Sequence, residues 1–114
     1  MSASAEPRMT LQTVLVLRAL LEDPASELYG LELCQRAGLA SGTIHPILAR
    51  LEQVGWIESR WEEADPHREG RPRRRYYRLN PDGAEAARLA VARADQRRGR
   101  PSVLNPGWAG GAAR

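Results

Sequence analysis

Residues 28–55 read LYGLELCQRAGLASGTIHPILARLEQVG, and this segment carries the clearest helical pattern of the chain. Its first part places three apolar side chains on one helical face, at Leu31, Cys34 and Ala37. Gly38 follows where a helix typically ends, and Ser41, a good N-cap residue, opens another periodic run soon afterwards. Two short helices joined by a tight turn that contains glycine are typical of a helix-turn-helix. We therefore predict helices over residues 28–37 and 42–54.

The second helix of this pair has one apolar face and one small, weakly charged face. The apolar positions follow the spacing of a helix, at Ile44, Ile47, Leu48 and Leu51. The opposite side carries Gly42, Pro46, Ala49, Arg50 and Gln53. Such a side can lie close to another surface. Because a proline inside a helix removes a backbone hydrogen bond, we expect either a start at Thr43 or a distorted first turn.

The flanking sequence adds a helix before this pair. Thr10 can cap a helix that runs to about Asp23, where Pro24 stops it. This helix is apolar on more than one side, which favours packing both on its own domain and on a second subunit.

After the pair, the pattern predicts a hairpin and one more helix. Strands are expected over residues 56–61 and 73–79, separated by an irregular polar stretch over 62–72. Asn80-Pro81 then begins a helix that extends to about residue 98 and carries a stripe of small side chains, at Ala84, Ala87, Val91 and Ala94. The fold class is therefore mainly α with a two-stranded β wing, a winged helix-turn-helix followed by one C-terminal helix.

Length and composition limit the number of domains, the possible disulfides and the location that we expect for the protein. A chain of 114 residues fits one domain, and we expect four segments: a disordered lead-in over 1–8, a winged-helix domain over 9–80, a helix over 81–98 and a disordered tail over 99–114. The single cysteine, Cys34, excludes an intrachain disulfide. No apolar run is long enough to be a signal peptide or to cross a bilayer. These features predict a cytoplasmic protein without a membrane partner.

The charge is unevenly distributed. All 17 basic residues are arginine, and the net charge is +3. Residues 1–65 hold five Arg and ten acidic residues, whereas residues 66–100 hold eleven Arg and four acidic residues. A GC-rich genome explains the abundance of arginine as well as function does, but it does not explain the clustering. Arginine binds phosphates and guanine edges in bidentate fashion, so the basic half favours nucleic acid as a partner.

Three motifs resemble the PadR family of bacterial winged-helix regulators. They are Tyr29-Gly30, the run Ser41-Gly42-Thr43-Ile44-His45-Pro46 with Arg50-Leu51-Glu52, and Gly70-Arg71-Pro72-Arg73 leading into Tyr76-Tyr77-Arg78-Leu79 with Gly83. The resemblance covers about residues 9–92. It implies a homodimer that binds double-stranded DNA, usually as a repressor, with the third helix in the major groove. In some members a phenolic or other small aromatic ligand releases the DNA.

Two features depart from the family pattern. His45 stands where the family commonly has tyrosine, which puts the role of that position in doubt. Other family members bind flat hydrophobic compounds at the centre of the dimer. The C-terminal region here is one short helix without an aromatic residue, so the resemblance does not extend to such a pocket.

The strongest candidates for DNA contact are four arginines of the wing: Arg71, Arg73, Arg74 and Arg75. Guanidinium–phosphate pairing would supply sequence-independent affinity that falls with salt. The alternative is a solvated basic loop that nearby acids partly neutralise. In the helix, the candidates are Ser41, Thr43, His45 and Arg50. Ser41 can serve as an N-cap and a phosphate contact at once, His45 is as readily a plain surface residue, and Arg50 can read guanine.

The remaining predictions concern the dimer and excluded functions. The interface is expected on the first and last helices, through Leu11, Leu15, Leu89 and Val91. Four aromatic residues are interpreted as core or as lying just outside it, with a ligand role as the alternative: Trp56, Trp61, Tyr76 and Tyr77. Cys34, His45 and His67 lack metal-ligand spacing, and no catalytic motif is present, so we expect no enzyme activity, cofactor or metal. A winged helix used as a protein-interaction module and an RNA binder are the competing functions.

Overall fold

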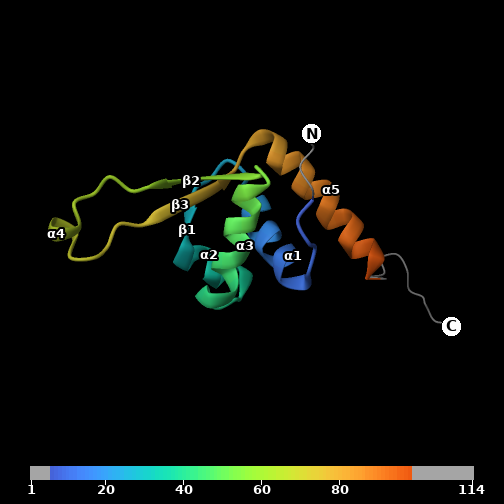
Figure 1. Ribbon diagram of the computed structural model, residues 1–114, viewed down its shortest axis with the longest axis horizontal. Coiled ribbons are helices and arrows are strands. Elements are labelled where there is room, and N and C mark those ends of the chain that lie inside the picture. Colours follow the sequence, from blue (N-terminus) through green and yellow to red (C-terminus); the bar gives the residue numbers. More distant parts are fainter. Residues whose placement is uncertain (1–5, 99–114) are drawn as a thin grey trace.

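The computed structural model describes residues 6–98, which form a small helical body with a projecting hairpin (Figure 1). The elements follow in the order α1 (Leu11–Leu21), β1 (Leu28–Tyr29), α2 (Gly30–Ala37), α3 (Ser41–Gln53), β2 (Ile57–Trp61), α4 (Pro66–Glu69), β3 (Arg75–Leu79) and α5 (Pro81–Arg97). The sheet is antiparallel with the strand order β1-β3-β2. This arrangement confirms the predicted winged helix-turn-helix.

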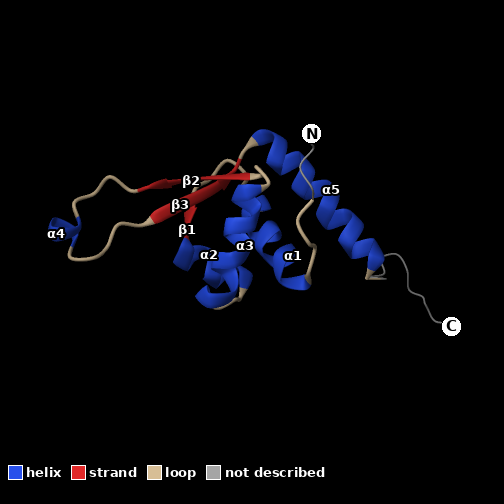
Figure 2. Cartoon of the chain, in the orientation of Figure 1, coloured by secondary structure: helices blue, strands red, loops and turns tan. Residues whose placement is uncertain are grey.

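The core lies where α1 meets α2, α3 and α5. Its most deeply buried large side chains come from three helices: Val16, Leu17, Leu20, Leu33, Ile44, Leu48 and Leu51. The sheet adds Ile57, Tyr77 and Leu79, which share one face because side chains alternate along a strand. The small stripe of α5 is buried, as its composition suggested, and it lets α5 pack closely along α1. Figure 2 shows α5 extending away from the sheet on the side opposite the hairpin.

The start of α5 is fixed to the turn that follows α3. The Asn80 side chain accepts a hydrogen bond from the Gly83 amide at 2.6 Å and donates one to the Gly55 carbonyl at 2.7 Å. A Cβ placed on Gly83 would lie 2.0 Å from the Trp56 carbonyl oxygen. Glycine is therefore required here by the close approach of the two backbones. The predicted helix start at Asn80-Pro81 is confirmed, with Asn80 as the N-cap.

The first half of the helix-turn-helix differs from the prediction. Leu28 and Tyr29 are not helical but form β1, which pairs with Tyr77 and Tyr76 of β3. In α2 the buried residues are Leu33 and Ala37, and Cys34 is partly buried, whereas Leu31 is exposed. Periodicity alone allowed either face of this short helix to point inward, and packing against α1 and α3 selects Leu33.

Helix α3 begins at Ser41, earlier than expected, and its N-cap is Ala40. Ser41 therefore does not cap the helix. Pro46 lies inside the helix, so of the two alternatives for this proline the start at Thr43 is wrong. Gly42, whose carbonyl would bond to residue 46 in a regular helix, is exposed, so water can satisfy that carbonyl in place of the missing donor.

The wing and the N-terminal segment also differ from the prediction. The stretch predicted as irregular contains the short helix α4, which Asp65 caps by accepting a hydrogen bond from the His67 amide. Strand β3 begins at Arg75 rather than at residue 73. Within the expected lead-in, Pro7 is buried and Glu6 pairs with Arg93, while residues 1–5 and the expected tail 99–114 lie outside the described residues. No helix of residues 6–98 is long and apolar enough to cross a membrane.

Candidate nucleic-acid interface

Helix α3 presents a strip of small side chains to the solvent. The strip consists of Gly42, Pro46, Ala49 and Gln53, all of which are exposed. The opposite face is buried through Ile44, Leu48 and Leu51. A helix with a slim outer face can approach the floor of a groove, because no bulky side chain holds its backbone away.

The four residues predicted on this helix are all exposed but lie on two flanks of the strip. Because successive residues turn by about 100°, Thr43 and Arg50 fall on one flank and Ser41 and His45 on the other. The contacts agree with this division. A cavity on the first flank is shared by Arg50 and the segment that leads into α1. On the second flank, the His45 ring lies beside Gly30 of α2, 3.4 Å from the position of an added Cβ.

A polar brace joins the end of α3 to the base of the wing. The Ser59 hydroxyl donates to the Glu52 carboxylate at 2.7 Å, and the Arg75 guanidinium donates to the same hydroxyl at 2.7 Å. The Arg75 guanidinium is also 3.6 Å from the Glu52 carboxylate and lies over the Trp61 ring at 5.0 Å. These four residues, the α3–wing brace, come from α3, β2 and β3 and fix the hairpin relative to the helix.

Farther out, Glu62 organises the loop of the wing. Its two carboxylate oxygens accept hydrogen bonds from the Arg71 guanidinium at 2.7 and 3.0 Å, and one of them also accepts from the Arg74 amide at 2.9 Å. These bonds, first from Arg71 and then from Arg74, lower the pKa of Glu62 to about 2. Arg71 is therefore occupied in holding the two sides of the loop together.

The other face of the hairpin is covered by stacked rings and guanidinium groups. The Arg74 guanidinium lies 4.2 Å from the centre of the Tyr29 ring, which meets Tyr76 edge to face at 5.9 Å. Arg60 lies over Tyr76 and binds the Glu27 carboxylate through two hydrogen bonds of 2.7 Å. The hydrogen bond from Arg60 lowers the pKa of Glu27. Of the aromatic residues interpreted as core, Trp56 and Tyr77 are buried and Tyr76 is partly buried, but Trp61 is 55% exposed, so the interpretation is wrong for Trp61.

Of the four predicted wing arginines, Arg73 is the most available. Its side chain is exposed and donates one hydrogen bond, to the Ala64 carbonyl at 3.1 Å. Arg68 of α4 is exposed at the tip and has no partner within residues 6–98. Sequence reasoning missed Arg68, although its place among the loop breakers could have suggested a tip position.

The predicted dimer residues are not equally accessible. Leu11 and Leu89 are 53% and 52% exposed, and Leu15 is partly buried. Val91 is only 8% exposed, because it packs within the protomer core. Leu11 and Leu89 are thus the residues of this set that have apolar surface left to bury in a dimer.

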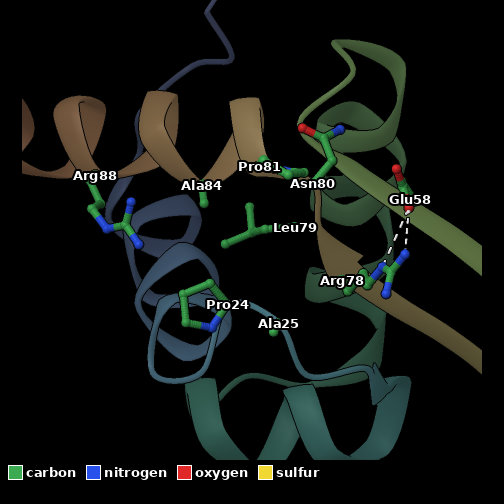
Figure 3. Close-up of a pocket in the computed structure, with 9 residues that line it drawn as sticks. All are labelled: Pro24, Ala25, Glu58, Arg78, Leu79, Asn80, Pro81, Ala84 and Arg88. Carbon is green, nitrogen blue, oxygen red and sulfur yellow. Dashed lines mark hydrogen bonds and ion pairs between the residues drawn. The ribbon is translucent and has the colours of Figure 1, made fainter.

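A cavity of about 470 Å³ opens between the hairpin and the start of α5 (Figure 3). Leu79 and Ala84 form part of its apolar floor, and Arg78 and Arg88 approach from two sides. Arg78 is held by Glu58 at 3.4 Å. Among residues 6–98 there is no group of acidic, histidine or cysteine side chains that could hold a metal.

The sequence and the fold both resemble those of known transcription regulators. The sequence profile of the Transcriptional regulator PadR-like family matches residues 16–89, which is more than half of the chain. No curated protein matches the chain. The matched range includes the whole helix-turn-helix, the wing and the first half of α5.

Solved structures share the fold. Overoxidized AbfR bound to DNA is 26% identical with a TM-score of 0.59, and the match covers 78% of this chain but only 61% of AbfR. A PadR family transcription regulator from Clostridium difficile is 21% identical with a TM-score of 0.60, over 79% of this chain and 93% of the other. BpsR from Bordetella bronchiseptica is 19% identical with a TM-score of 0.64, over 90% and 74%. The chain thus spans less than two thirds of AbfR.

Proposed function

Because the chain belongs to the PadR-like family of transcriptional regulators, we propose that it is a sequence-specific double-stranded DNA-binding repressor. The observation that carries this proposal is the slim exposed face of α3 beside a wing with exposed arginines at its tip. The fold shared with DNA-bound AbfR supports the same function.

In this proposal α3 enters the major groove and the wing follows the backbone. The small strip of α3 lies against the bases, with Ser41, Thr43, His45 and Arg50 at its edges. Arg73 reaches phosphates directly, while Arg71, Arg74 and Arg75 shape the wing through their internal contacts. Phosphate contacts of this kind give affinity that falls steeply with salt.

The active unit is proposed to be a homodimer. The exposed leucines Leu11 of α1 and Leu89 of α5 would be buried between two copies. A two-fold dimer would bind two half-sites about one duplex turn apart.

A small aromatic ligand is the proposed effector, and the cavity in Figure 3 is its proposed site. The apolar floor suits a single ring, and Arg78 and Arg88 suit a carboxylate. In the structural neighbour BpsR, DNA binding is regulated by 6-hydroxynicotinic acid. A carboxylate that drew Arg78 away from Glu58 would act on the hairpin itself.

A gel-shift series tests the proposal. The protein is titrated into the duplex immediately upstream of its own gene, a scrambled duplex, duplex RNA and single strands, at several salt concentrations. We expect the tightest binding to the upstream duplex and a steep loss of affinity with salt. Equal binding to RNA, or no binding to any duplex, would contradict the proposed function.

A further inference from the structure

A second cavity, of about 200 Å³, lies on the outer flank of α3 next to the N-terminal segment. It is lined by Pro7, Arg8, Thr10, Thr13, Pro46, Ile47, Arg50 and Leu51. Two arginines from separate parts of the chain, Arg8 and Arg50, therefore line one small space. No carboxylate is among the described lining residues.

Neither of these two arginines has a partner within residues 6–98. Most other arginines of the helical body do: Arg18 binds Asp95, Arg36 binds Glu22, Arg88 binds Glu85 and Arg93 binds Glu6. Two cations that share a cavity repel each other unless an anion lies between them. The Arg8–Arg50 cavity is thus suited to an oxyanion.

The segment that carries Arg8 is held in place on both sides. Glu6 accepts a hydrogen bond of 2.6 Å from Arg93 of α5, Pro7 is buried, and the Met9 carbonyl accepts one of 3.2 Å from Arg98. Thr10 then caps α1 by accepting a hydrogen bond from the Thr13 amide at 3.1 Å. The backbone at Arg8 is consequently anchored, so less conformational entropy is lost when its side chain binds.

We propose that Arg8 and Arg50 together hold one phosphate of the DNA duplex, beside the groove that α3 enters. This inference rests on the proposed function and assigns a position in it. Arg50 lies on the flank of α3 rather than in its central strip, which places it nearer to the backbone than to base edges. The expected lead-in thereby becomes part of the binding surface.

Phosphate contact predicts a characteristic salt response. Loss of one phosphate contact lowers the slope of log K against log salt by about 0.9 per protomer. Arg8→Ala should therefore weaken binding to the upstream duplex and to a scrambled duplex by a similar factor, about fivefold, and should reduce the slope on both. Arg8→Lys keeps the charge and should keep the slope.

Arg97→Ala is the matched control, because Arg97 is also exposed and has no partner within residues 6–98 but lies on the last turn of α5. It should leave the affinity and slope unchanged. If Arg8→Ala behaves like Arg97→Ala while the wild type binds DNA, the phosphate assignment is wrong and the proposed function stands. If the wild type binds no duplex, both are wrong.

A double-mutant cycle tests whether the two arginines share one anion. Arg8→Ala should weaken binding much less in an Arg50→Ala background than in the wild type. Calorimetric titration with inorganic phosphate, in the absence of DNA, identifies a small-anion site. Phosphate binding that Arg8→Ala abolishes, together with unchanged DNA affinity, would assign the cavity to a free anion and overturn the DNA assignment. Strictly additive effects would overturn the shared contact.

Discussion

The wing and the outer flank of α3 use arginine in opposite ways. In the wing, where the arginines cluster in the sequence, Arg71 is bound to Glu62, Arg74 lies on Tyr29 and Arg75 belongs to the α3–wing brace. On the flank, Arg8 and Arg50 belong to the acidic half of the chain and yet have no partner within residues 6–98. Whether an arginine is available to a ligand therefore depends on the side chains that it contacts in the folded protein. It does not depend on how many arginines lie nearby in the sequence.

The difference follows from what each region must do. A long hairpin beyond the core has little apolar surface to bury, so charge-assisted hydrogen bonds and ring stacking hold its shape. The flank of α3 rests on a packed helix and needs no such ties. Its cations are left for a ligand.

The largest expected effect removes the frame that positions both regions. In Gly83→Ala, the new Cβ would lie 2.0 Å from the Trp56 carbonyl oxygen, so α5 must move away from the turn between α3 and β2. We expect a loss of about 3–5 kcal/mol of unfolding free energy, or failure to fold. Urea denaturation followed by circular dichroism measures it. Gly42→Ala is the control, because nothing lies within 4 Å of its added Cβ, and it should be neutral or stabilising.

The second prediction compares one arginine from each region. Arg50→Ala should weaken DNA binding by about tenfold on specific and scrambled duplexes alike, because a phosphate contact carries no sequence information. Arg74→Ala should change affinity by about twofold or less, since Arg74 stacks on Tyr29. Fluorescence anisotropy with both duplexes decides the matter. A loss confined to one base pair of the operator would return Arg50 to the guanine contact predicted from the sequence.

This comparison also shows what the sequence could predict. The helices, the hairpin and the order of elements followed from local signals such as the Thr10 cap, Gly38 and Asn80-Pro81, and the structure has them all. Strand β1 was missed because two residues carry no periodicity, and its formation depends on β3, which lies far along the chain. The cap at Ser41 failed because Ala40 takes that position.

For the candidate site, the sequence predicted which residues would be exposed but not which parts of the chain they would contact. All four residues predicted on α3 are exposed, yet their division between two flanks depends on the neighbours, α2 and the N-terminal segment. The place of Arg8 in the candidate site could not be predicted, because a short polar lead-in has no local pattern that indicates an ordered structure. Its anchoring by Arg93 and Arg98 joins residues from opposite ends of the chain, and no local pattern reports such contacts.

A third, smaller effect separates positioning from direct contact. Glu52→Ala removes the carboxylate that links α3 to Ser59 and Arg75. We expect DNA affinity to fall about threefold, because the wing is less well oriented, while the salt slope stays at the wild-type value. Affinity measured at four or more salt concentrations gives both quantities. A reduced slope would mean that the α3–wing brace contributes to phosphate binding itself, and the contrast between the two regions would weaken.

The smallest effect concerns the pH dependence of the wing. The pKa of Glu62 is about 2, below its ordinary value of 4.5, because the ionised carboxylate accepts hydrogen bonds from Arg71 and the Arg74 amide. Since the folded pKa is the lower one, this carboxylate stabilises the loop fully above about pH 4.5, and the contribution is lost as the pH falls toward 2.

A carboxyl-detected NMR titration should give a midpoint near 2 in the wild type, and the Arg74 amide shift should follow it. In Arg71→Ala the midpoint should rise toward 4.5, whereas Arg73→Ala should leave it in place, because Arg73 bonds to the Ala64 carbonyl instead. Equal midpoints in the wild type and Arg71→Ala would mean that Arg71 does not hold the Glu62 carboxylate and is as available to DNA as Arg8 and Arg50. The wing and the outer flank of α3 would then not differ in how they use arginine.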